Sequence, residues 1–144
     1  MNGLVFVDTN VLLYAVDRAD RKKHVAARAW RKKLWETRRG RVSFQVLQEF
    51  YANVARKWPD SAASARLEVV DLLTWQPIKI DGEILRLVWK VQDRYGMSFW
   101  DALIVATAIA SGCEVLLSED FQAGQDLGGL LVVNPFSTEP ESVL

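Results

Sequence analysis

Short runs rich in Val, Ile and Leu recur along the chain, separated by longer stretches that mix apolar and polar residues. The runs show no sustained alternation of apolar and polar positions, which is typical of strands buried on both faces and therefore of parallel sheets. They predict strands at residues 4–7, 78–80, 115–117 and 130–133, with a shorter candidate at 41–44.

Between these runs, apolar residues recur at helical spacing. In the segment 44–57, Leu47 and Phe50 share one face, and Ser43 is suited to cap the N-terminus of the helix. The segment 99–111 is apolar nearly all round and predicts a central buried helix. Further helices are expected at residues 10–16, 21–38, 61–74 and 83–95. Strands that alternate with helices predict a three-layer α/β/α domain.

The length and composition fit one ordinary globular domain. A chain of 144 residues can bury a sizeable core but is short for two domains. Its single cysteine, Cys113, excludes an internal disulfide and a cysteine-based zinc cluster. No apolar run approaches the length of a membrane span, and the Met-Asn-Gly start lacks the basic region of a signal peptide. We therefore expect a cytoplasmic protein without membrane contact, with one domain at 1–136 and a loosely held tail at 137–144.

The two halves of the chain carry opposite charge. Residues 1–66 hold 14 Lys and Arg against 6 Asp and Glu, whereas residues 67–144 hold 4 against 12. Such asymmetry indicates a polyanionic partner for the basic half and cations or a basic partner for the acidic half. A chance difference between helix surfaces would produce the same pattern, so charge alone does not decide.

Two common kinds of catalytic site are disfavoured. The only histidine is His24, so a histidine-based zinc site is excluded, and a Ser or Cys nucleophile would have to pair with this one residue. No glycine-rich phosphate-binding loop occurs. The six tryptophans lie within or beside helical patterns and are expected mostly in the core, although one or two could stack on bases if exposed.

Acidic residues stand at unusual places. Asp8 directly follows the apolar run 4–7, and the trio Ser118, Glu119 and Asp120 follows the run 115–117. In open α/β sheets, ligands bind beyond the carboxyl ends of the strands, so both acidic groups fall at the functional edge. Two further acids are Asp101, at the start of the most apolar helix, and Glu49, beside the apolar stripe of the segment 44–57.

These acids have a catalytic and a structural interpretation. Grouped carboxylates raise one another's pKa unless a cation joins them, and hard divalent ions such as Mg²⁺ prefer such oxygen ligands. Alternatively, each acid has a local structural role. Asp8, Thr9 or Asn10 could cap a helix, Asp101 could complete a capping box with Ser98, Asp120 could cap a turn, and Glu49 could be a solvated surface residue.

Four stretches together carry a resemblance to a known family. They are "FVDTNVLLYAVD", "SFQVLQEFYANV", "MSFWDALIVATAIASGCEVLLSEDFQAGQ" and "VVNPF", in this order along the chain. In this ordered set of acidic motifs, residues 4–136 resemble the PIN-domain family, and within it the VapC-type toxins of toxin–antitoxin pairs. The resemblance implies a PIN-like nuclease domain with a central parallel five-stranded sheet. It also implies an endoribonuclease toxin that hydrolyses RNA phosphodiesters by Mg²⁺- or Mn²⁺-activated water.

The resemblance also implies roles for individual residues. The acidic positions of the family fall on Asp8, Glu49, Asp101 and Asp120, of which Asp8, Asp101 and Asp120 would bind metal and Glu49 would bind metal or orient water. Asp120 is preferred to Glu119 because it stands two residues after the serine. Thr9, Asn10 and Ser118 match the supporting polar positions of the family. The implied partners are RNA, a cognate antitoxin whose segment lies across the active site, and a second copy in a homodimer.

The basic half offers candidates for RNA binding, and two other functions stay open. Lys22, Lys23, Lys32 and Lys33 are expected to approach the RNA backbone. One alternative is a catalytically inactive RNA- or partner-binding module whose acids only cap helices. The other is an aspartyl-phosphate phosphatase with Asp8 as nucleophile, which is weakened because Asn10 stands where a second aspartate is expected.

Overall fold

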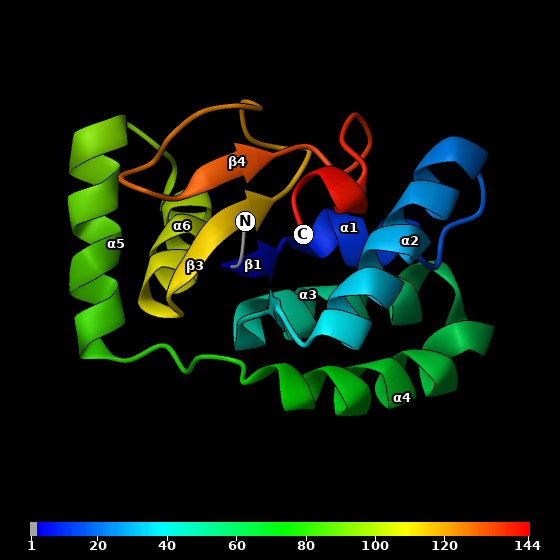
Figure 1. Cartoon of the computed structure of the whole chain (residues 1–144). Coiled ribbons are helices and arrows are strands. Elements are labelled where there is room, and N and C mark those ends of the chain that lie inside the picture. Colours follow the sequence, from blue (N-terminus) through cyan, green and yellow to red (C-terminus); the bar gives the residue numbers. More distant parts are fainter. Residues whose placement is uncertain (1–2) are drawn as a thin grey trace.

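The computed structural model describes residues 3–144, and within them the expected α/β fold with a parallel sheet is confirmed (Figure 1). Residues 1–2 lie outside the described residues. They belong to the predicted domain at 1–136 and to the start on which the expectation of no signal peptide rests. All strand pairs are parallel, and the spatial order is β2-β1-β3-β4. The strands are β1 (Leu4–Val7), β2 (Gly40–Arg41), β3 (Cys113–Leu117) and β4 (Leu131–Val133).

Six α-helices connect and cover these strands in the described part of the chain. They are α1 (Thr9–Tyr14), α2 (Arg21–Thr37), α3 (Phe44–Lys57), α4 (Ala62–Leu72), α5 (Gly82–Tyr95) and α6 (Phe99–Ala110). Short 3₁₀ helices occupy Pro59–Ser61, Leu73–Trp75 and Pro140–Ser142. Five of the α-helices begin after an Asp or Ser whose side chain accepts a backbone N–H bond, which satisfies a donor that the first turn leaves free. These capping residues are Asp8, Asp20, Ser43, Asp81 and Ser98.

The prediction of a strand at 78–80, and with it a five-stranded sheet, is wrong for residues 3–144. Ile78 makes one isolated parallel bridge with Ser43, beside β2. The pairing cannot extend, because Ile80 is already 40% exposed and Asp81 caps α5 directly afterwards. The edge strand β2 also ends earlier than the candidate at 41–44, since Ser43 serves as the N-cap of α3.

The helices lie in two groups around the sheet. Helix α6 packs on β3 and α5 packs on α6, while α1 contacts α2 and α3, and α4 packs on α3. Figure 1 shows α5 and α6 at one side of the molecule and α1 to α4 at the other. Every residue from Ala102 to Ala108 is buried, so the central position expected for the apolar helix is confirmed. None of the helices in residues 3–144 is long and apolar enough to cross a membrane.

The C-terminal segment 137–144, for which the sequence predicts a loosely held tail, contacts the body of the protein. The buried Trp30 side chain donates its indole N–H to the carbonyl oxygens of Pro135 and Thr138, at 3.1 and 3.0 Å. Pro140 is buried within the last 3₁₀ helix. These contacts attach the segment to α2.

Candidate functional site

The pairing of β1 with β3 brings Asp8 and Ser118 together. Val7 and Leu117 are partners in the parallel ladder, and the backbone N–H of Asp8 donates to the carbonyl oxygen of Leu117 at 3.0 Å. The next residue of each strand therefore emerges at the same carboxyl edge. There the Ser118 hydroxyl, which is fully buried, donates to Asp8 Oδ2 at 2.7 Å.

The two carboxylate oxygens of Asp8 have different partners. Its Oδ1 accepts the backbone N–H of Thr9 at 2.7 Å, so the predicted capping of the first helix is confirmed. Its Oδ2 accepts from Ser118 and, at 3.4 Å, from the side-chain amide of Asn10. Capping thus uses one oxygen of the carboxylate, and the other faces the acidic cluster.

Asn10 joins Asp8 to the loop after β3. Its Nδ2 donates to Asp120 Oδ2 at 2.8 Å, and lies 3.3 Å from Ser118 Oγ. The backbone N–H of Asp120 also donates to Ser118 Oγ, at 3.1 Å. These bonds direct the Asp120 carboxylate toward Asp8, across a separation of 112 positions in the sequence.

Glu49 reaches the same cluster from α3. Its Oε2 accepts the Thr9 hydroxyl at 2.9 Å, and its Oε1 accepts the side-chain amide of Gln45 at 2.8 Å. With both oxygens bound, Glu49 is not a freely solvated surface residue. Gln45, which is buried, was not among the candidates from the sequence. The only signal there was its position one helical turn before Glu49.

Asp101 shares the sheet edge but stands apart from the other acids. Helix α6 runs back to β3 through a tight turn at Ser111 and Gly112. Its 12 residues span about 18 Å and the five of β3 about 16 Å, so the helix begins near the level at which the strand ends. The Asp101 backbone N–H donates to Ser98 Oγ at 3.2 Å. Among residues 3–144, no hydrogen bond or ion pair joins its exposed carboxylate to Asp8, Glu49 or Asp120.

The structure separates the two adjacent acids that follow Ser118. Glu119 forms an ion pair with Lys23 of α2, at 2.7 Å, whereas Asp120 bonds to Asn10. The Lys23 ammonium also lies over the rings of Tyr14 and Phe136, 4.9 and 5.3 Å from their centroids. Glu119 is therefore drawn toward α2, and only Asp120 joins the cluster with Asp8.

The surroundings of Asp8 disfavour its negative charge. Burial, at 6% exposure, is the largest of the causes that raise the pKa of Asp8 from 3.8 to about 6, and the nearby charges of Asp120 and Glu49 act in the same direction. The hydrogen bonds from Ser118 and Thr9 lower this pKa and offset part of the effect. Three carboxylates at one edge thus create a site that a cation would stabilise.

The types of ligand atom in the cluster fit a hard divalent ion. Within residues 3–144, no three His, Cys, Asp or Glu side chains are already arranged around one metal position. The available donors are nevertheless carboxylate and amide oxygens, which Mg²⁺ and Mn²⁺ prefer. In addition, Asn10 Oδ1 and Gln45 Oε1 are buried oxygen atoms for which the described residues provide no hydrogen-bond donor. Such atoms call for a partner from outside the chain, either water or an ion.

The remaining candidates lie elsewhere. His24 donates from Nδ1 to the Tyr14 carbonyl oxygen at 2.9 Å, at the junction of α1 and α2. Of the four lysines expected to bind RNA, Lys23 is engaged with Glu119, Lys22 and Lys32 are exposed, and Lys33 is half-buried. Lys32 lies 3.9 Å from Glu36, a weak surface pair.

Comparisons with known proteins agree with the fold. The sequence model of the PIN domain matches residues 5–124. A solved structure, described as a toxin–antitoxin complex from Klebsiella pneumoniae, superposes with a TM-score of 0.65 and 22% identity, over 91% of this chain and 97% of that chain. At this identity the similarity concerns the fold. A search of curated proteins gives no match.

Proposed function

The chain belongs to the PIN domain family, and from this premise we propose that it is a divalent-metal-dependent endoribonuclease and the toxin of a toxin–antitoxin pair. The observation that carries the proposal is the hydrogen-bonded network of Asp8, Asp120 and Glu49 at the carboxyl edge of the sheet. Helix capping explains one oxygen of Asp8 but explains neither Asp120 nor Glu49. A cluster of acids from three distant segments can bind a divalent cation, and such a cation can in turn hold a phosphodiester.

The proposed roles follow from the oxygen atoms that each residue offers as metal ligands. Asp8, Asp101 and Asp120 would hold Mg²⁺ or Mn²⁺, and Glu49 would act as a further ligand or orient the attacking water. The bound ion would neutralise the phosphodiester and make water a better nucleophile. Thr9 and Gln45 fix the Glu49 carboxylate through hydrogen bonds to its two oxygens.

Ser118 and Asn10 would organise the acids before the ion arrives. Ser118 donates its hydroxyl to Asp8 and accepts the backbone N–H of Asp120, so it fixes both residues at once. The Asn10 amide supplies N–H groups to Asp8 and Asp120, which lessens the repulsion between two carboxylates in the absence of metal. These contacts support the assignment of both residues as positioning groups.

The exposed lysines of α2 support RNA as the substrate. Lys22 and Lys32 project into solvent from the basic half of the chain, where a polyanion would be attracted. Lys33 is less exposed, and Lys23 is already paired with Glu119. We therefore give Lys22 and Lys32 the larger share of the proposed contacts with the RNA backbone.

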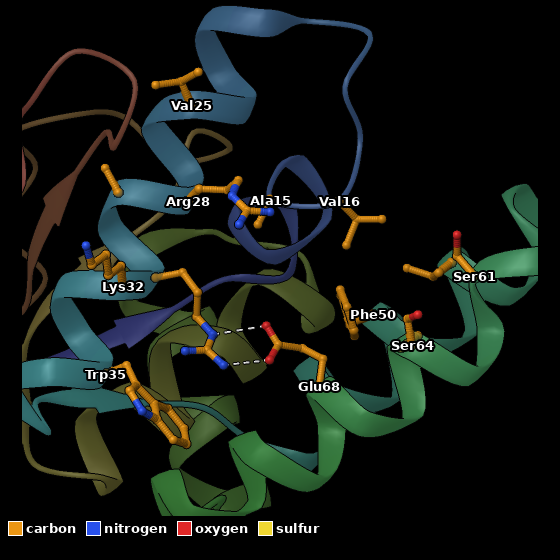
Figure 2. A pocket seen from close by; sticks show the side chains of 14 residues that line it. Ala15, Val16, Val25, Arg28, Lys32, Trp35, Phe50, Ser61, Ser64 and Glu68 are labelled. Carbon is orange, nitrogen blue, oxygen red and sulfur yellow. Dashed lines mark hydrogen bonds and ion pairs between the residues drawn. The ribbon is translucent and has the colours of Figure 1, made fainter.

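A groove of about 700 Å³ between α2 and α4 supports an antitoxin partner (Figure 2). Its walls combine exposed apolar side chains such as Val25 and Trp35 with basic ones such as Arg28, and none of the four acids lines it. The pattern suits a peptide segment that carries apolar and acidic side chains. Phe50, next to Glu49 on α3, also lines the groove, so the groove and the acidic cluster share this helix.

The structure of the groove makes the antitoxin part of the proposal testable. Arg31 and Glu68 join the two helices through paired hydrogen bonds of 3.0 and 2.6 Å, which keep the groove in shape (Figure 2). A neutral Val25→Ser change in the groove should weaken neutralisation by the antitoxin and leave RNA cleavage unchanged, because it removes an apolar contact without altering the charge near Lys22 and Lys32. A short reading frame for a DNA-binding protein just upstream would identify the candidate antitoxin. We also propose that the protein is a homodimer in the cytoplasm. Sedimentation equilibrium tests the number of subunits.

The activity is tested by incubating RNA with the purified chain in EDTA, Mg²⁺ or Mn²⁺. Cleavage should require the metal and should disappear in the Asp8→Asn variant. A phosphatase would instead release phosphate from a small aryl phosphate, and a binding module would retain RNA without cutting it. Metal-independent cleavage, or equal cleavage by the unsubstituted chain and the Asp8→Asn variant, would overturn the proposal.

A further inference from the structure

Trp100 is exposed at the start of an otherwise buried helix. Its side chain is 64% exposed, whereas residues Ala102 to Ala108 of the same helix α6 are all buried. Placing a large aromatic ring in water at this position forgoes the stabilisation that its burial would bring. The exposed ring is therefore a candidate for contact with a ligand.

The ring of Trp100 is held in a defined direction. It meets the ring of Phe99 edge to face, with centroids 5.0 Å apart and an interplanar angle of 87°. Phe99 itself is half-buried and packs against the hydrophobic core. One neighbour thus anchors the indole from the side and leaves its surface accessible, which reduces the entropy that the ring loses when a flat ligand stacks on it.

Trp100 adjoins the proposed site in the sequence and in the fold. It directly precedes Asp101, so the two Cα atoms are about 3.8 Å apart. The first turn of α6 lies near the level of Ser118, because α6 and the following β3 have similar lengths and opposite directions. A ligand held by Asp101 at this edge of the sheet would therefore lie within reach of the indole.

We propose that Trp100 stacks on an unpaired nucleobase of the RNA substrate, an inference that rests on the proposed ribonuclease function. The half of the sequence to which Trp100 belongs, residues 67–144, carries 12 acidic against 4 basic residues, so its net charge disfavours a contact with phosphate. A nucleobase is uncharged and stacks on aromatic rings without regard to sequence. Bases in a duplex already stack on one another, so the substrate class is RNA with at least one base free of pairing.

The test measures RNA affinity in the Asp8→Asn background, which should bind RNA without cutting it. Fluorescence anisotropy would follow one labelled RNA, free of secondary structure, and the same sequence in a duplex. Trp100→Ala should weaken binding of the unpaired RNA about 5- to 160-fold and leave the duplex unchanged, since stacking on one aromatic side chain accounts for roughly that range. Trp100→Phe should retain most of the affinity. Trp89→Ala is the matched control, because Trp89 is 55% exposed on α5, and it should bind as the parent does.

A second measurement separates this inference from the proposed function. In the chain with Asp8 intact and Mn²⁺ present, Trp100→Ala should raise KM for the unpaired RNA by a similar factor. If the unsubstituted chain cleaves RNA and Trp100→Ala changes neither affinity nor KM, the stacking proposal is overturned while the proposed function stands. The same conclusion holds if Trp89→Ala has an equal effect, or if Trp100→Ala only dissociates a dimer. If the unsubstituted chain cleaves no RNA, the proposed function fails first.

Discussion

The side-chain amide of Asn10 lies 2.8 Å from the carboxylate of Asp120 and joins the first helix of the chain to the loop after its third strand. One residue comes from the basic half and the other from the acidic half. Their contact shows that the fold, through the parallel pairing of β1 with β3, assembles the candidate site from segments far apart in sequence. The first test of this arrangement concerns the charge that it concentrates around Asp8.

Without metal, the charged form of Asp8 should destabilise the protein. Its pKa is raised from 3.8 to about 6, so the folded state holds the proton more tightly than the unfolded state does. The stability due to protonated Asp8 is therefore complete below about pH 4 and is lost as the pH rises through about 6. Asp8→Asn should recover at most about 3 kcal/mol of unfolding free energy at neutral pH, and little at about pH 4.

Urea unfolding at both pH values, in EDTA, measures this difference. The Asn side chain can still accept the Thr9 N–H as a helix cap, so capping is preserved. Asp93→Asn is the control, because Asp93 is an exposed acid on α5. An equal change at both pH values for Asp8→Asn would contradict the assigned charge effect.

Divalent metal should offset the destabilisation of the folded state by the charge of Asp8. If Mg²⁺ or Mn²⁺ binds only the folded site, as proposed, it should raise the melting temperature of the unsubstituted chain in proportion to the logarithm of its concentration above Kd. The Asp8→Asn variant should lose this response, and Asp93→Asn should keep it. Thermal unfolding monitored by circular dichroism provides the measurement. The idea fails if all three proteins respond equally.

The ion pair of Lys23 with Glu119 predicts different behaviour for the four lysines. RNA binding should be weaker in the variants Lys22→Gln, Lys32→Gln and Lys33→Gln. The slope of log affinity against log salt concentration should fall by up to about one unit for each phosphate that is no longer neutralised. Lys23→Gln should leave the slope unchanged, since its charge already faces Glu119 at 2.7 Å. Affinity measured over a range of salt concentrations tests this, and a reduced slope for Lys23→Gln would show that Lys23 contacts phosphate.

Asp101 allows the capping and catalytic interpretations to be separated. Only its backbone N–H takes part in the capping bond with Ser98, and its side chain is exposed. Asp101→Gln should therefore fold with nearly unchanged stability. Any loss should be smaller than the roughly 0.5–2 kcal/mol typical of losing a cap. RNA cleavage should nevertheless fall by orders of magnitude, because a neutral amide cannot replace the charged metal ligand that the proposal assigns to Asp101. Cleavage at the normal rate by a folded variant would remove Asp101 from the site.

Local sequence patterns predicted most of the fold because they report burial and capping. They failed at 78–80, where Ile78 resembles part of a buried strand but Asp81 begins a helix three residues later. A strand at a sheet edge depends on how many residues remain to pair, and apolar composition does not record this.

The candidate site was less accessible from the sequence. The spacing after Ser118 favoured Asp120 over Glu119 only through the family resemblance. The structure separates the two acids through residues far away, because Lys23 pairs with Glu119 and Asn10 with Asp120. Contacts of this kind depend on tertiary packing of α2 and α1 against the loop, and no local pattern contains them.

The most direct test of the central claim is the single-turnover rate of RNA cleavage, measured against Mn²⁺ concentration, for the unsubstituted chain, Asp120→Asn and Asp93→Asn. Asp120 is exposed, so the loss of its charge should not prevent folding. The account predicts that cleavage by Asp120→Asn falls by orders of magnitude or requires far more Mn²⁺, while Asp93→Asn cuts like the unsubstituted chain. Equal rates and equal metal dependence in all three proteins would contradict the assignment of the acidic cluster as the metal-dependent active site.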